Sequence, residues 1–100
     1  MISGVYRSKS EVELLDNIKH AELAARKLWI EGWAVICPHK NTAFLGGLCD
    51  DSVWIDGALE FLKRSDAVYM LNNWRQSDGA KTELLKAQEW GKQIIYEIDC

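Results

Sequence analysis

Short apolar runs alternate with helical patterns along this chain of 100 residues, and this alternation most strongly constrains its fold. Continuous apolar runs of strand length occur at residues 33–37 and 67–71. Further strands are expected at residues 1–6 and 93–98. The order β-α-β-α-β-α-β, with short connections, is typical of a parallel sheet whose faces are covered by helices.

Three helices are expected between these strands, over residues 10–31, 52–64 and 80–90. The first begins at the capping box Ser10-Glu11-Val12-Glu13, after which apolar residues recur at helical spacing. Residues 38–50 contain several Gly and Asn residues and are expected to form a loop.

The predicted fold is therefore α/β, a flavodoxin-like or Rossmann-like three-layer sandwich with three helices and four parallel strands in the order 2-1-3-4. Its length suits one domain, residues 1–100, and no repeat or linker divides it. Only Met1 and Ile2 precede the Ser3-Gly4 turn, so either the first strand is short or this start is internal to a longer chain.

Composition excludes several classes of protein. The net charge is −3 and no basic run occurs, so a nucleic-acid polymer is not an expected partner. The cysteines Cys37, Cys49 and Cys100 form no CxxC pair, which argues against a disulfide framework and a metal site and suits a reducing cytoplasm. No apolar run is long enough to span a membrane, and no signal-peptide pattern is present.

Tryptophan is unusually frequent, with five residues: Trp29, Trp33, Trp54, Trp74 and Trp90. One small core does not easily bury so many large side chains, and symmetric association is a common way to cover apolar surface. We expect a homo-oligomer, most simply a dimer, with at least one of Trp29, Trp54 and Trp90 at the subunit contact.

Ligands of open α/β sheets bind at the carboxyl ends of the strands. Three loops are expected to converge there, at residues 3–8, 38–51 and 72–79. The polar candidates around them are Arg7, His39, Asn41, Asp56 and Asp66. Each also has a plainer interpretation, as a residue that stabilises a loop or a turn through hydrogen bonds.

Glu83 is the most informative residue. Small residues Gly79, Ala80 and Ala87 lie on its face of the third helix, which leaves room for a group to approach the carboxylate. The segment Ser77-Asp78-Gly79-Ala80 opens this helix, and a helix N-terminus can bind phosphate or carboxylate. The alternatives are a solvated glutamate that complements the helix dipole and an ordinary N-cap.

The chain resembles an uncharacterised family, known only as a domain of unknown function, that is related to nucleoside 2-deoxyribosyltransferases and 2′-deoxynucleoside 5′-phosphate N-hydrolases. The resemblance covers nearly the whole chain, and its most specific part is the block W-x-x-S-x-G-A-x-x-E that follows a D-A-V-x-x-L strand. It is carried by Ser3-Gly4-Val5-Tyr6-Arg7, Pro38-His39-Lys40-Asn41-Thr42, Ser65-Asp66-Ala67-Val68-Tyr69-Met70-Leu71, Trp74-Arg75-Gln76-Ser77-Asp78-Gly79-Ala80 and Glu83.

This resemblance implies a function. Glu83 would be a nucleophile that attacks the anomeric carbon of a deoxyribose and forms a covalent intermediate, which water or a second base then resolves. Asp66, the second expected catalytic residue, would lie near base and sugar and orient the ligand, and Ser77 would hold a 5′-phosphate. The other residues expected to bind substrate are Ser3, Gly4, Tyr6, Arg7, His39, Asn41, Trp74 and Gly79. No metal or organic cofactor is implied.

One departure from the family pattern keeps a second hypothesis open. The related enzymes carry an acidic residue eight positions before Asp66, where this chain has Ala58. Asp56 would point about 200° away on a helix and is a poor substitute. The chain is therefore either an N-glycosidase or deoxyribosyltransferase acting on a nucleoside or its 5′-phosphate, or a non-catalytic binder of such a molecule in the same cleft.

Overall fold

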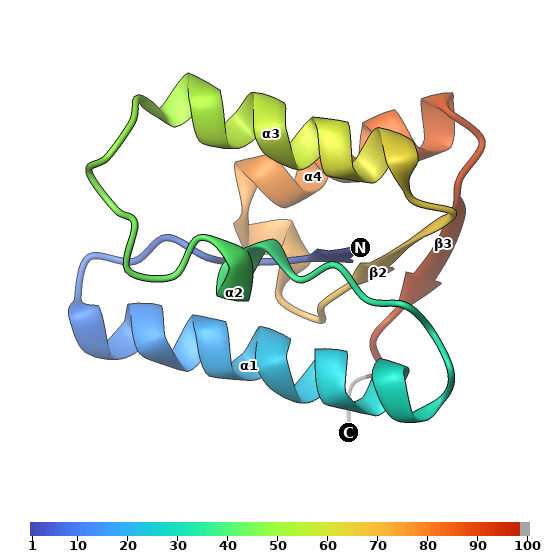
Figure 1. Cartoon of the computed structure of the whole chain (residues 1–100), viewed down its shortest axis with the longest axis horizontal. Coiled ribbons are helices and arrows are strands. Elements are labelled where there is room, and N and C mark those ends of the chain that lie inside the picture. The colour runs from blue at the N-terminus through green and yellow to red at the C-terminus, as the bar shows by residue number, and fades with distance from the viewer. Residues whose placement is uncertain (99–100) are drawn as a thin grey trace.

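The computed structural model describes residues 1–98 and contains three strands and four α-helices (Figure 1). The elements are, in chain order, β1 (Ile2–Ser3), α1 (Glu11–Ile30), α2 (Pro38–Asn41), α3 (Asp51–Arg64), β2 (Ala67–Met70), the 3-10 helix η1 (Trp74–Gln76), α4 (Asp78–Glu89) and β3 (Gln93–Tyr96). Cys100 lies outside the described residues.

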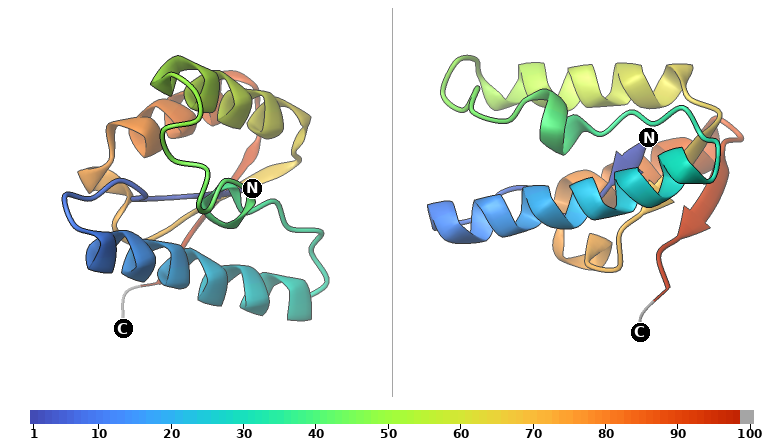
Figure 2. Two further views of the ribbon diagram at one scale, coloured as in Figure 1. Left: turned by 60° about the vertical axis from the view of Figure 1, so that its left-hand side comes forward. Right: turned by 60° about the horizontal axis from the view of Figure 1, so that its bottom comes forward.

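The three strands form one parallel sheet in the order β1-β2-β3. In its register Tyr69 of the central strand lies between Ile2 and Ile95. Helix α1 covers one face of this sheet, and α3 and α4 cover the other (Figures 1 and 2). The fold is therefore a small α/β domain with helices on both sides of a parallel sheet.

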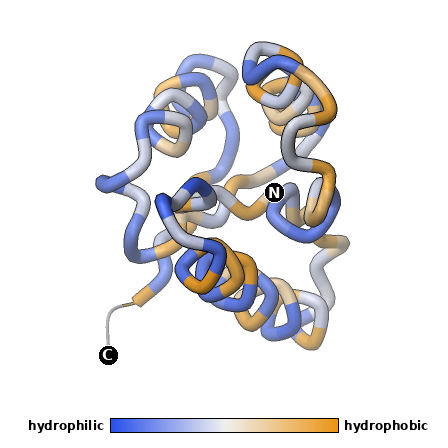
Figure 3. The backbone as a smooth tube through the Cα atoms, turned by 90° about the vertical axis from the view of Figure 1, so that its left-hand side faces the viewer, coloured by the Kyte–Doolittle hydropathy of each residue, from blue (hydrophilic) through white to orange (hydrophobic). Residues whose placement is uncertain are grey.

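The core is divided between the two faces because successive strand side chains point in opposite directions. Tyr69 and Leu71 pack against α1, whereas Val68 and Met70 pack against α3 and α4. Hydrophobic and hydrophilic residues alternate along the helices, as expected for helices with one face on the sheet (Figure 3). All four side chains of β2 are buried, which explains its continuous apolar sequence.

The predicted sheet of four strands in the order 2-1-3-4 is wrong. Residues 33–37 do not form a strand, and in the described part of the chain one backbone hydrogen bond, from Ile2 N to Ile36 O (2.9 Å), joins them to β1. β1 is two residues long and pairs with β2 on its other side, and its pairing with residues 33–37 is limited to this one bond. Trp33 and Ala34 are also exposed, so this apolar run is not buried on both faces.

The number of helices also differs from the three predicted. The short helix α2 lies within residues 38–50, which were expected to form a loop, and it begins with Pro38 at a position where proline is favoured. Helix α3 begins at Asp51 with Asp50 at its N-cap, rather than at Ser52.

The predicted capping box at the start of α1 is confirmed in one of its two hydrogen bonds. The Ser10 side chain accepts from Glu13 N (3.1 Å), whereas Ser10 N donates to Ser8 Oγ (3.4 Å) instead of to the Glu13 side chain. At the start of α4 the Ser77 side chain accepts from Ala80 N (3.1 Å), and this helix begins at Asp78 rather than at Ala80. Among residues 1–98 no helix is long and apolar enough to cross a membrane.

Candidate functional site

A carboxylate and a hydroxyl meet at the carboxyl end of β1. Ser3, the last residue of this strand, is buried, and its Oγ donates a hydrogen bond to Glu83 Oε1 at 2.5 Å. Glu83 lies in the second turn of α4 and is partly buried. The sheet and the helix therefore hold this carboxylate in a fixed place.

The small residues around Glu83 explain how it reaches the strand. Ala80 and Ala87, one turn on either side, are buried in the core cluster that contains Val68 and Met70. Side chains of this size let α4 lie close to the sheet, and the group that approaches Glu83 is the Ser3 hydroxyl. Burial raises the pKa of the Glu83 carboxyl, and the hydrogen bond from Ser3 partly opposes this rise.

The N-terminus of α4 lies one and a half turns before Glu83. Its first amides have no intrahelical partners, as in any α-helix, and they carry the positive end of the helix dipole. Gly79 is exposed, and a Cβ placed on it would meet Ser77 Oγ at 3.7 Å. Asp78 is also exposed and lies 3.9 Å from Lys81 Nζ. A small anion can therefore approach the amides of Asp78 and Gly79 closely.

The segment that follows β1 is held tightly by its neighbours. A Cβ on Gly4 would lie 2.6 Å from Leu71 Cδ1, so no larger residue fits without displacing this core side chain. Val5 N donates to Asn73 Oδ1 (3.1 Å), and Val5 O accepts from His39 Nε2 (3.1 Å). The segment of Gly4 and Val5 is therefore fixed both by the loop that follows β2 and by α2.

His39 is the buried polar residue of α2, with 5% of its surface exposed. Burial lowers its pKa, so the ring is neutral at physiological pH. The proton on Nε2 is donated to Val5 O, which leaves Nδ1 as an acceptor, and Nδ1 is buried with no hydrogen-bond partner among the described residues. The rings of His39 and Tyr6 pack edge to face, and their centroids are 5.6 Å apart.

Three of the predicted residues lie away from Glu83. Arg7 is exposed and pairs with Asp51 at the start of α3 (2.9 Å). Asn41 lines a separate groove of about 560 Å³ between α1, α3 and residues 35–41. Asp66 is exposed at the amino end of β2, whereas Ser3 lies at the carboxyl end of its neighbour, so the structure does not bring Asp66 and Glu83 together.

Trp74 is partly buried and packs against the core cluster beneath α4. Its ring lies 6.2 Å from that of Tyr96, and the Arg75 guanidinium lies 4.7 Å above it. These contacts give Trp74 a packing role near the loop that follows β2.

Ala58 is partly buried on α3, and Asp56 on the same helix is exposed.

Sequence reasoning missed a second polar cluster at the carboxyl ends of the strands. His20 Nε2 lies 2.7 Å from Glu97 Oε1, which also accepts a hydrogen bond from Asn72 N (2.8 Å). Asn73 Nδ2 lies 3.4 Å from His20 Nδ1. The rule that polar residues directly after parallel strands converge would have identified Asn73 and Glu97, but nothing in the sequence marks His20 within its helix.

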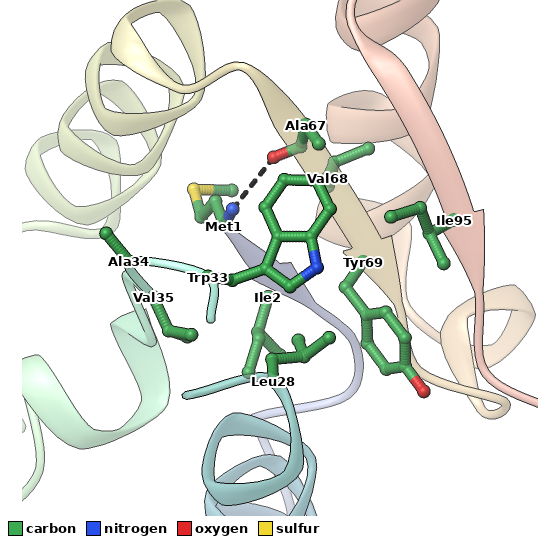
Figure 4. Close-up of a pocket in the computed structure, with 10 residues that line it drawn as sticks. All are labelled: Met1, Ile2, Leu28, Trp33, Ala34, Val35, Ala67, Val68, Tyr69 and Ile95. Carbon is green, nitrogen blue, oxygen red and sulfur yellow. Dashed lines mark hydrogen bonds between the residues drawn. The ribbon is translucent and has the colours of Figure 1, made fainter. Parts of the chain in front are cut away.

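A small cavity lies elsewhere in the domain. It measures about 30 Å³, and its lining comes from the amino ends of the strands and from the segment after α1 (Figure 4). This volume is far below that of a typical ligand pocket, roughly 300–1,000 Å³. Neither this cavity nor the groove beside Asn41 is lined by Ser3, Ser77 or Glu83.

Chemically, the arrangement offers a desolvated carboxylate, a neighbouring hydroxyl and a helix N-terminus. A carboxylate of this kind can act as a nucleophile or stabilise a developing cation, and the helix end can bind an anion. Among the residues that the structure describes, no group of three or more His, Cys, Asp or Glu side chains could hold a metal ion.

Comparisons with known proteins identify the family but no activity. No curated protein and no solved structure matches the chain. A family model described as a domain of unknown function, DUF4406, matches residues 11–96. Because this match covers far more than half of the chain, the chain belongs to the DUF4406 family.

Proposed function

We propose that the chain hydrolyses or transfers the N-glycosidic bond of a (deoxy)nucleoside or its 5′-phosphate, with Glu83 as the nucleophile. The observation that carries this proposal is the hydrogen bond between Ser3 and a partly buried Glu83 at the carboxyl end of the sheet. The resemblance to nucleoside 2-deoxyribosyltransferases supports it, because that resemblance assigns the same glutamate to catalysis. A cytoplasmic location is part of the proposal and agrees with the free thiols of Cys37 and Cys49.

The reaction follows the logic of a retaining glycosidase. A Glu83 oxygen attacks the anomeric carbon as the bond from that carbon to the base nitrogen breaks, and the base leaves with the bonding electrons. Water or a second base then displaces Glu83 and restores the carboxylate. Burial favours this step because a poorly solvated carboxylate is a better nucleophile, while Ser3 keeps it oriented.

The remaining parts of the site bind the ligand. The amides at the start of α4, together with the Ser77 hydroxyl, suit a 5′-phosphate. Gly4, Tyr6 and His39 belong to the tightly held segments beside Ser3 and suit contacts to sugar or base. Asp66 receives no role in this mechanism because it is exposed at the opposite end of β2.

A second candidate function is binding without catalysis, and Ala58 favours it. The departing base needs a proton, and an alanine supplies none where the related enzymes have an acidic residue. In the catalytic hypothesis this proton comes from solvent, so turnover is slow and falls as pH rises.

Base release tests the proposal directly. The protein is incubated with each 2′-deoxynucleoside and each 5′-monophosphate, and the products are separated by chromatography. We expect release of the base by the wild type and a loss of at least about 100-fold in Glu83→Gln, the scale typical of removing a nucleophile.

Glu89→Gln is the matched control, because Glu89 lies on the same helix and is exposed. Its activity should equal that of the wild type. Tight binding of a nucleotide without any base release by the wild type would reject catalysis in favour of the binder. Activity of Glu83→Gln within a few-fold of wild type would reject the nucleophile.

A further inference from the structure

The polar cluster that joins His20, Asn73 and Glu97 lies at the carboxyl end of the sheet, as the Ser3–Glu83 pair does, but has no part in the reaction above. Its members come from α1 and from the segments that follow β2 and β3. Through Val5 the cluster also reaches the segment that follows β1. One connected set of hydrogen bonds therefore links the carboxyl ends of all three strands to the middle of α1.

The direction of every hydrogen bond in this cluster is determined by its chemistry. Val5 N is a backbone donor, so the side-chain atom of Asn73 that faces it must be the oxygen (3.1 Å). The amide nitrogen of Asn73 therefore faces His20 Nδ1, at 3.4 Å. Since an amide nitrogen only donates, Nδ1 is the acceptor, and the proton of a neutral His20 is on Nε2.

The same logic continues to Glu97. Nε2 of His20 donates to Glu97 Oε1 (2.7 Å), and this oxygen also accepts from Asn72 N (2.8 Å). An oxygen that accepts two hydrogen bonds suits an ionised carboxylate. Each group thus has one role, and reversing any one of them leaves two donors or two acceptors facing each other.

The end of this network is close to Glu83 along the chain. Val5 is two residues after Ser3, and the intervening Gly4 is packed against Leu71 with no space for another atom. A shift of Val5 is therefore transmitted to Ser3, whose hydroxyl holds Glu83. Because of this rigid connection, a change in the cluster should move the end of β1. A change in an ordinary surface network would not.

We propose that Asn73 is a positioning residue, which together with His20 and Glu97 fixes the segment from Ser3 to Val5 so that the Ser3 hydroxyl meets Glu83. This inference rests on the proposed role of Glu83, but the network can be tested without substrate. The titratable groups near the cluster are His39 on α2, which interacts with the charge of His20, and Tyr69 on β2, which interacts with that of Glu97. The charged group near Glu83 is the N-terminal ammonium of Met1.

The first test is the state of the His20 ring. The chain has two histidines, so ¹⁵N NMR resolves both rings, and His20→Gln assigns them. We expect the proton of neutral His20 on Nε2. In Asn73→Ala the donor to Nδ1 is lost, so the share of the Nε2–H tautomer should fall. A proton on Nδ1 in the wild type, or an unchanged tautomer share in folded Asn73→Ala, overturns the network.

The second test is the titration of the Glu83 carboxyl, followed by ¹³C NMR. Asn73→Ala frees Val5 and weakens the bond from Ser3, which should raise the midpoint of Glu83 further, by about 0.5 pH unit. Asn73→Asp keeps an acceptor for Val5 N and should restore the wild-type value. An unchanged Glu83 midpoint in folded Asn73→Ala rejects the positioning role.

Asn72→Ala is the matched control, because it keeps the backbone N–H that donates to Glu97 and should leave the His20 tautomer and the Glu83 titration unchanged. If Asn73→Ala does not fold, His20→Gln gives the same second test, since it removes the partner of Asn73 Nδ2. Absence of base release in the wild type would reject the proposed function alone. A changed Glu83 midpoint in Asn73→Ala would still support the positioning role.

Discussion

The two ends of the sheet carry different kinds of side chain. At the carboxyl end, side chains that follow the strands form hydrogen bonds with one another, as in the pair of Ser3 and Glu83 and the cluster around Asn73. At the amino end the lining is apolar, and Trp33 closes a cavity of about 30 Å³ (Figure 4). Next to that cavity, the last turn of α1 exposes Trp29 by 57% and Ile30 by 87%.

This difference assigns separate tasks to the two ends. Polar groups at the carboxyl end converge without entering the core, which suits recognition and chemistry. Exposed large apolar side chains at the amino end carry no such chemistry, and covering them favours association. Function and assembly can therefore be disrupted independently, and the following variants test that separation.

The largest effect is expected at the amino end. We propose that the chain forms a homodimer through the surface that includes Trp29 and Ile30. Trp29→Asp should weaken the dimer by at least about 2 kcal/mol, roughly 30-fold in Kd, because buried tryptophans are frequent hot spots. Light scattering over a concentration series measures this change.

Val12→Asp is the control, since Val12 is 70% exposed at the opposite end of the same helix. It should leave the mass unchanged, and Trp29→Asp should retain the ligand affinity of the wild type. A monomeric wild type at micromolar concentration would refute the dimer.

The next effect concerns close packing at the carboxyl end. In Gly4→Ala the new Cβ would lie 2.6 Å from Leu71 Cδ1, and we expect a loss of about 1–3 kcal/mol in the free energy of unfolding. Gly57→Ala, within α3, meets nothing within 4 Å and should stabilise the protein by about 0.5–1 kcal/mol. Urea denaturation measures both. Equal stability of the two variants would show that Gly4 is not tightly packed.

A comparison of two helix caps separates stability from ligand binding. Ser10 and Ser77 each accept a hydrogen bond of 3.1 Å at the start of a helix, so Ser10→Ala and Ser77→Ala should each cost about 1 kcal/mol of stability. Only Ser77→Ala should also narrow the difference in affinity between a 5′-monophosphate and its nucleoside, by about 1–3 kcal/mol. Calorimetry measures these affinities. An equal effect of both variants would remove the phosphate assignment.

The smallest effect is a dependence of stability on pH. Because the pKa of Glu83 is raised on folding, the folded state keeps this proton to higher pH than the unfolded state. The contribution of the Glu83 carboxyl to the free energy of unfolding is fully present below the ordinary glutamate pKa of about 4.3. It is lost as pH rises through the raised pKa of the folded state. Glu83→Gln should remove this slope and be slightly more stable than wild type at pH 7.

Urea midpoints at several pH values check this sign, with Glu89→Gln as the variant that keeps the slope. A Glu83→Gln protein less stable than wild type at pH 7 would contradict a desolvated carboxylate. Such a result would indicate that the ionised side chain supports the fold.

Sequence patterns were reliable where local physics determines the structure. The cap at Ser10 and the apolar run that became β2 are set by short-range hydrogen bonding and by burial on both faces. The run at residues 33–37 failed because a strand also needs a partner, and the two residues of β1 provide one hydrogen bond. Apolar periodicity contains no information about the length of the neighbouring strand.

The site was predictable only in part for a related reason. Glu83 and Ser77 could be singled out because Ser77 lies at the start of the predicted helix that carries Glu83. Ser3 was expected to bind substrate, but its pairing with Glu83 could not be predicted because the two residues are 80 positions apart, and His20 shows no local signal. Asp66 was placed near the ligand by resemblance, yet it precedes β2, and only the direction of the strand shows that this is the opposite end.

The pairing of Ser3 with Glu83 spans 80 positions, and β1 pairs with a strand that begins more than 60 positions later. By contrast, β2, η1, α4 and β3 follow one another along the chain and can fold through nearby contacts. Closing so long a loop costs entropy before any contact compensates for it, so we expect β1 to join late. In a partly folded chain the carboxylate would then lack its hydroxyl partner, and the proposed chemistry would become possible only when the first strand docks.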